Sequence, residues 1–90
     1  MFDWFNAHAA TEFGKSLAGF LADRIPTKHA RKAPEALAKL FAQVEQFKQT
    51  NRLNMYKKAK LANAFRWKLV DYGYQDEFVE EMTKELLLHL

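Results

Sequence analysis

Gly14, Lys15 and Ser16 have the types and order found at the end of a phosphate-binding loop. In such a loop, G-x-x-x-x-G-K-[ST], backbone amides and the lysine hold the phosphates of a nucleotide. Ala9 stands where the first glycine belongs, and no buried strand is predicted before it. The helical spacing of apolar residues continues through the segment instead. We therefore expect Lys15 to lie on the polar side of a helix, and we predict no nucleotide or other cofactor.

Gly14 also belongs to a row of small residues at every fourth position. Small side chains on one face of a helix let a second helix approach closely. The row therefore predicts a helix contact along this face. Its members are Ala10, Gly14, Ala18 and Ala22.

Two histidine–glutamate pairs have the spacing that lets neighbouring side chains on a helix share a metal ion. They are His8 with Glu12, and Glu85 with His89. Two ligands do not make a metal site, because zinc sites in proteins use three or four protein ligands. We interpret the pairs as ordinary polar contacts, with His89 complementing the helix dipole, and we predict no metal site.

Carboxylates recur at helical spacing near the C-terminus, at Glu77, Glu81 and Glu85. Acid–base catalysis would need one of these carboxyl groups to be desolvated. A helix face so rich in charge is more often solvated or paired with lysines. The serine and threonines have no base that the sequence identifies, so we predict a protein that is not an enzyme.

The segment 54–72 carries two apolar stripes where a surface helix needs one. The inner stripe consists of Leu61, Ala62, Phe65, Leu69 and Tyr72, and the outer one of Tyr56, Ala59, Asn63, Trp67 and Val70. The outer stripe is explained by a helix lying centrally between three neighbours, by a homodimer interface, or by a site for another partner. The favoured hypothesis is a non-catalytic interaction or regulatory module. It would act by self-association or by docking a protein partner through Tyr56, Asn63, Trp67 and Val70, with Trp4 from the first helix.

Basic residues beside this stripe suggest nucleic-acid binding as the alternative function. The residues are Lys57, Lys60, Arg66 and Lys68. Lys28, Arg31 and Lys32 join them from the connection between the first and second helices. However, residues 54–72 carry a net charge of +4 and residues 73–90 a net charge of −4. If these two helices pack antiparallel, the lysines are expected to pair with Glu77, Glu81 and Glu85, which would cancel most of the basic field.

Composition indicates one globular domain over residues 1–90. The chain is 49% hydrophobic and 28% charged, with a net charge of +3. It has no cysteine, which suits a reducing compartment, so we expect the cytoplasm. We expect no signal peptide and no membrane span, because no apolar run reaches the roughly 20 residues needed to cross a bilayer. Membrane-surface contact by Phe2, Trp4 and Phe5 is disfavoured, since the first helix lacks an excess of basic residues.

The elements that must position these residues are all helical. With three glycines and two prolines, the chain has few turn residues, and its apolar spacing repeats near 3.6. We predict an all-α, compact four-helix domain with the third helix near its centre. The helices are expected at about 3–25, 34–50, 54–72 and 76–89. Their expected boundary residues are Pro26, Pro34, the N-cap Asn54, the closing Gly73 and the N-cap Asp76.

Overall fold

The described chain consists of amphipathic helices and their connections, in the order along the chain that the apolar spacing predicts. The computed structural model describes the backbone of residues 2–90 and the side chains of residues 7–90. None of these residues lies in a strand. The prediction of an all-α four-helix domain is therefore confirmed. The helices are α1 (Phe2–Ala22), α2 (Pro34–Thr50), α3 (Met55–Tyr72) and α4 (Asp76–His89).

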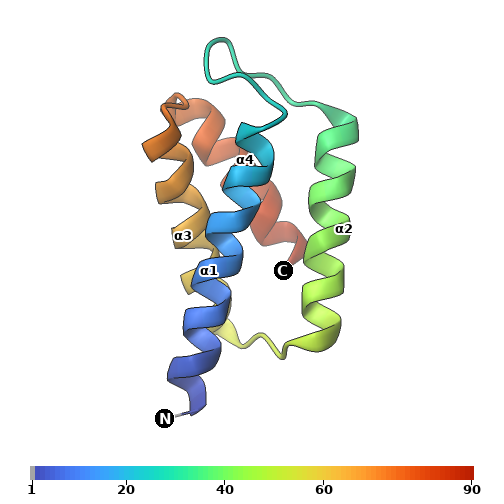
Figure 1. The fold of residues 1–90 in the computed structure, drawn as a ribbon, viewed down its shortest axis with the longest axis vertical. Helices are drawn as coiled ribbons and strands as arrows, with labels where there is room; N and C mark the ends of the chain where they lie inside the picture. Colours follow the sequence, from blue (N-terminus) through green and yellow to red (C-terminus); the bar gives the residue numbers. More distant parts are fainter. Residues whose placement is uncertain (1) are drawn as a thin grey trace.

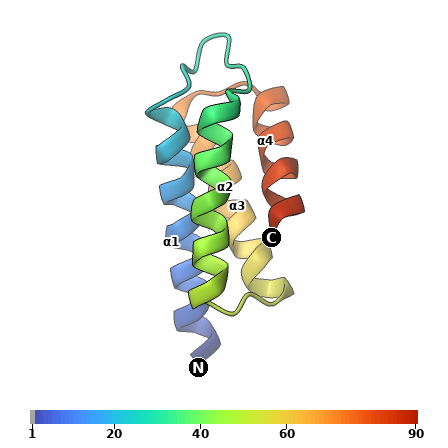
Figure 2. The same ribbon diagram turned by 90° about the vertical axis from the view of Figure 1, so that its right-hand side faces the viewer.

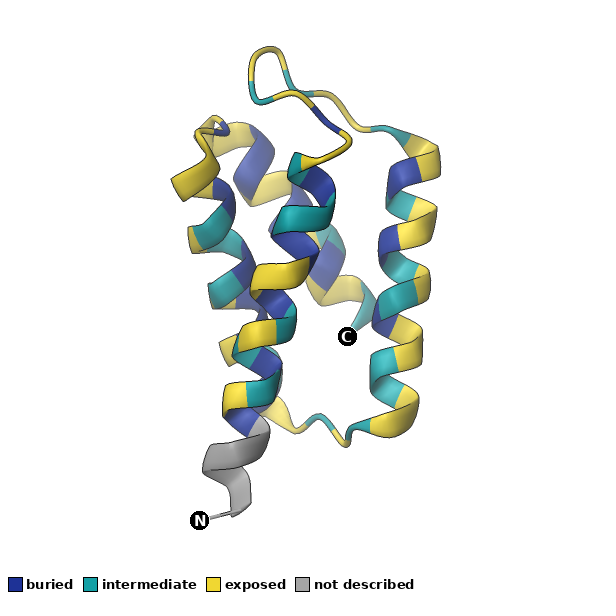
Figure 3. Cartoon of the chain, in the orientation of Figure 1, coloured by how far each residue is buried: buried dark blue, intermediate teal, exposed yellow. Residues whose placement is uncertain are grey.

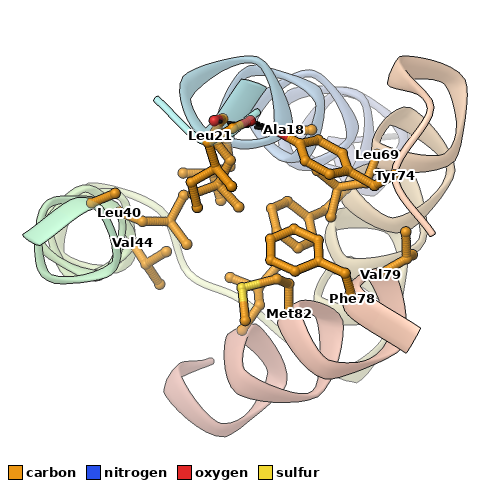
Figure 4. Packing of buried hydrophobic residues seen from close by; sticks show 14 of the residues in the cluster. Ala18, Leu21, Leu40, Val44, Leu69, Tyr74, Phe78, Val79 and Met82 are labelled. Carbon is orange, nitrogen blue, oxygen red and sulfur yellow. Dashed lines mark hydrogen bonds between the residues drawn. The ribbon is translucent and has the colours of Figure 1, made fainter. Parts of the chain in front are cut away.

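The four helices run alternately up and down, and α1 is parallel to α3 (Figures 1 and 2). In the close view of Figure 4, α1, α3, α4 and α2 follow one another around the core. α3 therefore packs against α1 and α4, and α2 lies across the core from it. The expectation that α3 lies near the centre, with three neighbours, is wrong. α3 occupies a corner of the bundle, so one of its sides has no helix to cover it.

α1 and α3 come closest where α1 carries its small residues. Ala10 and Ala18 are fully buried, and Gly14 is buried between them. A methyl group on Gly14 would overlap the carbonyl oxygen of Leu61 and would lie 3.2 Å from the Cβ of Ala64. The close helix contact that the small-residue row predicts is therefore confirmed, and its partner is α3.

All four helices contribute aliphatic and aromatic side chains to one core (Figure 4). Its largest fully buried side chains are Leu17 and Leu21 of α1, Leu40 and Val44 of α2, Leu61, Phe65 and Leu69 of α3, and Val79, Met82 and Leu86 of α4. Burial of each such side chain stabilises the fold by about 1.5–3 kcal/mol relative to an exposed one. Leu61, Phe65 and Leu69 of the inner stripe are thus used in folding. Tyr72, the last residue of α3, is 41% exposed, so its prediction as a core residue is wrong.

The capping residues at the ends of α3 and the start of α4 agree with the sequence predictions at two of three positions. Asn54 caps α3 as predicted, since its side-chain oxygen accepts a 2.9 Å hydrogen bond from the Lys57 backbone N–H. Gly73 ends α3 in the left-handed conformation, with φ of 101°. The prediction of Asp76 as the cap of α4 is wrong, because Gln75 holds that position and Asp76 is the first helical residue. The carboxylate of Asp76 still lies in the first turn of α4, where the helix dipole favours a negative charge.

α1 ends three residues earlier than predicted, before a turn that Tyr74 holds. After Ala22 the chain turns so that Ile25 enters the core, with 3% of its surface exposed. The buried Tyr74 hydroxyl donates hydrogen bonds to the carbonyl oxygens of Leu21 and Ile25. Tyr74 therefore joins the turn between α3 and α4 to the end of α1.

None of the helices in the part of the chain that the structure describes is long and apolar enough to cross a bilayer.

Replacing Gly14 by alanine is expected to lower the free energy of unfolding. Alanine favours a helix by about 1 kcal/mol over glycine, but overpacking against a backbone costs about 1–3 kcal/mol. Gly19→Ala is the matched control, because its methyl group would meet only the Tyr72 hydroxyl, at 3.3 Å, at the end of a movable side chain. Urea unfolding should show Gly14→Ala as the less stable variant. Equal stabilities would contradict the close contact.

Replacing Tyr74 by phenylalanine is expected to destabilise the fold by about 1–3 kcal/mol at neutral pH, because a buried carbonyl loses its donor. Burial, followed by the negative charge of Asp23, raises the pKa of Tyr74 above its ordinary value of 10.0. The unfolded chain therefore loses this proton first. The stability that protonated Tyr74 contributes to the fold is complete below pH 10.0. It decreases as the pH rises from there through the folded-state pKa of Tyr74. Urea unfolding across this range should show a smaller alkaline loss in Tyr74→Phe than in the wild type.

Candidate functional site

The residues that resemble a phosphate-binding loop lie inside α1. The Ser16 hydroxyl donates to the Phe13 carbonyl oxygen of the same helix, at 2.8 Å. Lys15 is exposed and forms a 3.4 Å ion pair with Glu12. The segment is therefore an ordinary helical turn, with its lysine in solvent as expected.

The histidine–glutamate pairs lie near the start of α1 and near the end of α4. Among residues 7–90, no three histidine, aspartate or glutamate side chains converge as a metal site would require. The Glu85 carboxylate contacts the Lys32 ammonium at 2.6 Å. The His89 ring stacks on Phe41 with 3.7 Å between ring centroids. The C-terminal pair therefore takes part in packing and in an ion pair.

The acidic row of α4 pairs with the connection between α1 and α2. The Lys32 ammonium lies 2.6 Å from Glu85 and 3.3 Å from Glu81, and the hydrogen bonds to Glu85 and then Glu81 raise its pKa. The expected pairing of this acidic row with the lysines of α3 is wrong. The connection between α1 and α2 lies against α4, and its Lys32 pairs with Glu81 and Glu85 instead. The ion pair between α3 and α4 involves Arg66 and Glu80, at 2.6 Å.

Tyr56 and Trp67 of the outer stripe remain on the surface. Figure 3 shows that α3 carries both exposed and buried positions. Tyr56 is 56% exposed, Trp67 58% and Val70 36%, and Asn63 is also exposed. We call Tyr56, Asn63, Trp67 and Val70 the aromatic face. The explanation that the stripe is buried between three neighbouring helices is therefore excluded. Trp4, the fifth predicted interface residue, has its side chain outside the described residues.

Basic side chains accompany the aromatic rings of α3. The Lys60 ammonium lies 5.6 Å from the centre of the Tyr56 ring, and the Arg66 guanidinium lies 5.1 Å from that of Trp67. Such distances allow cation–π attraction, which also orients the rings. Lys60 and Lys68 form no ion pair with any residue whose side chain is described.

Lys57 does not belong to this exposed basic flank. The residue is 7% exposed, and its ammonium donates a 3.1 Å hydrogen bond to the Arg52 carbonyl oxygen. It therefore stabilises the connection between α2 and α3. The sequence pattern grouped Lys57 with Lys60 because both fall between the two apolar stripes, but the chain before α3 folds back over Lys57.

Lys28, Arg31 and Lys32 also lie apart from the aromatic face. Arg31 and Lys32 border a depression of about 540 Å³ whose other wall is α4, including Glu81 and Lys84. Acidic and basic groups alternate there. The predicted nucleic-acid residues therefore divide between two sides of the bundle, and Arg66, paired with Glu80, lies between them.

A groove between α1 and α3 runs beside the aromatic face. It encloses about 330 Å³, and Trp67 lines it together with ammonium, amide and hydroxyl groups. Its polar lining residues are Thr11, Lys15, Lys60, Asn63, Lys68 and Asp71. Sequence reasoning did not assign Thr11 or Lys15 to the same site as Trp67. The small-residue row indicated that a helix packs beside Lys15, but it did not show which helix or in what register.

Comparison with known protein families, with curated protein sequences and with solved structures found no match for this chain. The chemistry of the surface is therefore the basis for assigning a function. The groove and the aromatic face offer cations and hydrogen-bonding groups from α1 and α3, together with two exposed aromatic rings on α3. This combination suits the binding of a large anionic or aromatic partner.

Truncation of the aromatic face is expected to leave the fold stable. Trp67→Ala and Tyr56→Ala should each change the free energy of unfolding by no more than about 0.5 kcal/mol, as exposed positions do. Phe65→Ala, on the buried side of the same helix, should lower it by about 3–5 kcal/mol. Urea unfolding followed by circular dichroism measures all three. A loss of several kcal/mol in Trp67→Ala would show that this ring belongs to the core.

Proposed function

We propose that this protein is a non-catalytic binding module whose contact surface is the aromatic face of α3. The observation that carries the proposal is the exposure of Tyr56 and Trp67, 56% and 58%, on a helix whose opposite side forms the core. Tyrosine and tryptophan are enriched at protein interfaces and dominate binding energies there. We further propose the cytoplasm as its location, since a chain without cysteine suits a reducing compartment.

The helix that carries this face is held firmly, which favours binding. Gly14 lets α1 lie against the backbone of α3, Phe65 is buried in the core, and Arg66 is bound to Glu80 of α4. A surface that is already ordered loses little conformational entropy when a partner arrives. The aromatic rings therefore contribute more of their contact energy to affinity than they would on a mobile loop.

The charge around the face favours a negatively charged partner over a second copy of the chain. Lys60 and Lys68 lie beside it, and a twofold dimer brings the same patch of both copies together. Such a dimer would place these lysines near their own counterparts, and like charges across an interface are unfavourable. Self-association through this face should therefore be weak at low ionic strength.

Sedimentation at different ionic strengths tests whether the aromatic face is a contact surface. It also distinguishes self-association from docking of another partner. We expect a monomer at about 0.05 M salt and weak self-association at about 0.5 M, where the repulsion between lysines is screened. The Trp67→Ala/Tyr56→Ala double variant should remain monomeric in both. Association that persists in the double variant would contradict the proposal.

Leu87→Ala/Leu88→Ala is the matched control, because these α4 side chains are 49% and 78% exposed. If this control abolishes association and the α3 variant does not, the contact surface lies on α4. A wild-type protein that stays monomeric at every salt concentration would remove self-association and leave partner docking.

A further inference from the structure

We infer that the partner of the aromatic face is a single-stranded nucleic acid. The strand lies along α3 in the groove beside α1, its bases stack on Trp67 and Tyr56, and its phosphates contact lysines of both helices. This inference rests on the proposed function, for which it names the partner. It differs from the alternative drawn from sequence by relying on Lys15, Lys60 and Lys68, and on neither Lys57 nor the 28–32 connection.

The groove contains the groups that a nucleotide requires. Trp67 offers an aromatic surface on which a base can stack, and Lys15, Lys60 and Lys68 surround it with ammonium groups. The exposed Asn63 side chain provides an amide donor and an acceptor for the edge of a base. Single-strand binding proteins combine these two elements, a positively charged groove and aromatic side chains that stack with successive bases.

The two aromatic rings are too far apart for one mononucleotide. Tyr56 and Trp67 are eleven residues apart in the same helix, or about 16 Å along its axis, and project from nearly the same side. A second hollow of about 170 Å³, lined by Thr11, Tyr56 and Lys60, continues the groove toward the start of α3. Lys60 borders both hollows, between the rings. This arrangement fits a strand that spans both positions.

The positive field of the groove is not cancelled by the neighbouring helix. On α4, Glu81 and Glu85 are bound by Lys32, and Glu80 by Arg66. The remaining local anions are Asp71, at one end of the groove, and Glu12, which pairs with Lys15 at 3.4 Å. The Lys15–Glu12 pair is solvent-exposed, so it contributes only about 0–1 kcal/mol, and a phosphate can compete for the lysine.

The shape of the surface favours a single strand over a duplex or an acidic protein. α1 and α4 flank α3, so α3 cannot enter a major groove alone, and a duplex keeps its bases stacked away from Trp67. An amphipathic partner helix would need an apolar groove. The polar groups of this groove come from three lysines, an asparagine, a threonine and an aspartate instead.

Fluorescence titration of a Trp4→Phe variant tests the inference, because Trp67 is then its single tryptophan. An oligothymidylate of about 12 nucleotides should quench Trp67, since base stacking is tolerant of sequence. With three lysines contacting phosphates, the logarithm of affinity should fall against the logarithm of salt with a slope of about −2. A duplex of equal length should bind more weakly.

Anisotropy of a labelled oligothymidylate compares the variants of the full chain. Trp67→Ala should weaken binding about tenfold or more, through lost stacking. Lys60→Gln and Lys68→Gln should each weaken it and make the salt slope shallower by about 0.7. Lys39→Gln removes the same charge from the exposed side of α2, across the core, and should have no effect beyond a small loss from net charge.

Polyglutamate separates failure of this inference from failure of the proposed function. If polyglutamate quenches Trp67 as strongly as the oligothymidylate, or if Trp67→Ala binds the oligothymidylate like wild type, the nucleic-acid inference is overturned and the docking face stands on the sedimentation result. A duplex that binds as tightly as the single strand also overturns it. If neither polyanion perturbs Trp67 and sedimentation shows no role for the face, both proposals fail.

Discussion

Because Gly14 has no side chain, the carbonyl oxygen of Leu61 reaches the backbone of α1, and this contact sets the register between α1 and α3. The register decides which residues of α3 point inward. Phe65 enters the core, whereas Trp67, two positions later, points away from it. The same register places Lys15 of α1 in one groove with Trp67. A wider separation of the two helices would disrupt the core packing and would remove this groove.

The charges of the last two helices are sorted rather than mixed, since residues 54–72 carry +4 and residues 73–90 carry −4. α4 is the most acidic helix, and its Glu80, Glu81 and Glu85 are bound by Arg66 and Lys32, which are therefore occupied within the bundle. Lys60 and Lys68 of α3 lie beside aromatic rings and form no ion pair with the side chains that the structure describes. A net charge of only +3 thus includes a locally basic face, because its compensating acids lie on another side of the molecule.

The bundle closes where Tyr74 binds the carbonyl oxygens at the end of α1. This hydrogen-bonded contact and the Gly14 contact hold α1 and α3 together at two levels. The aromatic face is consequently part of a rigid surface, and its exposed rings cannot be explained as a disordered segment. In the proposed function, a partner covers these exposed side chains.

The sequence alone determined the four helices, the capping of α3 by Asn54 and Gly73, and the need for a close helix contact along Ala10, Gly14 and Ala18. These features depend on local periodicity, backbone conformation and side-chain size, all of which a linear sequence displays. It also indicated that α3 is apolar on two sides.

Only the tertiary structure decided that α3 lies at a corner, that Lys57 is buried, and that Lys32 pairs with Glu81 and Glu85 of α4. It also decided that Lys15 shares a groove with Trp67. Each of these depends on which helices become neighbours and in what register, and residues distant in the chain settle that through packing of the common core.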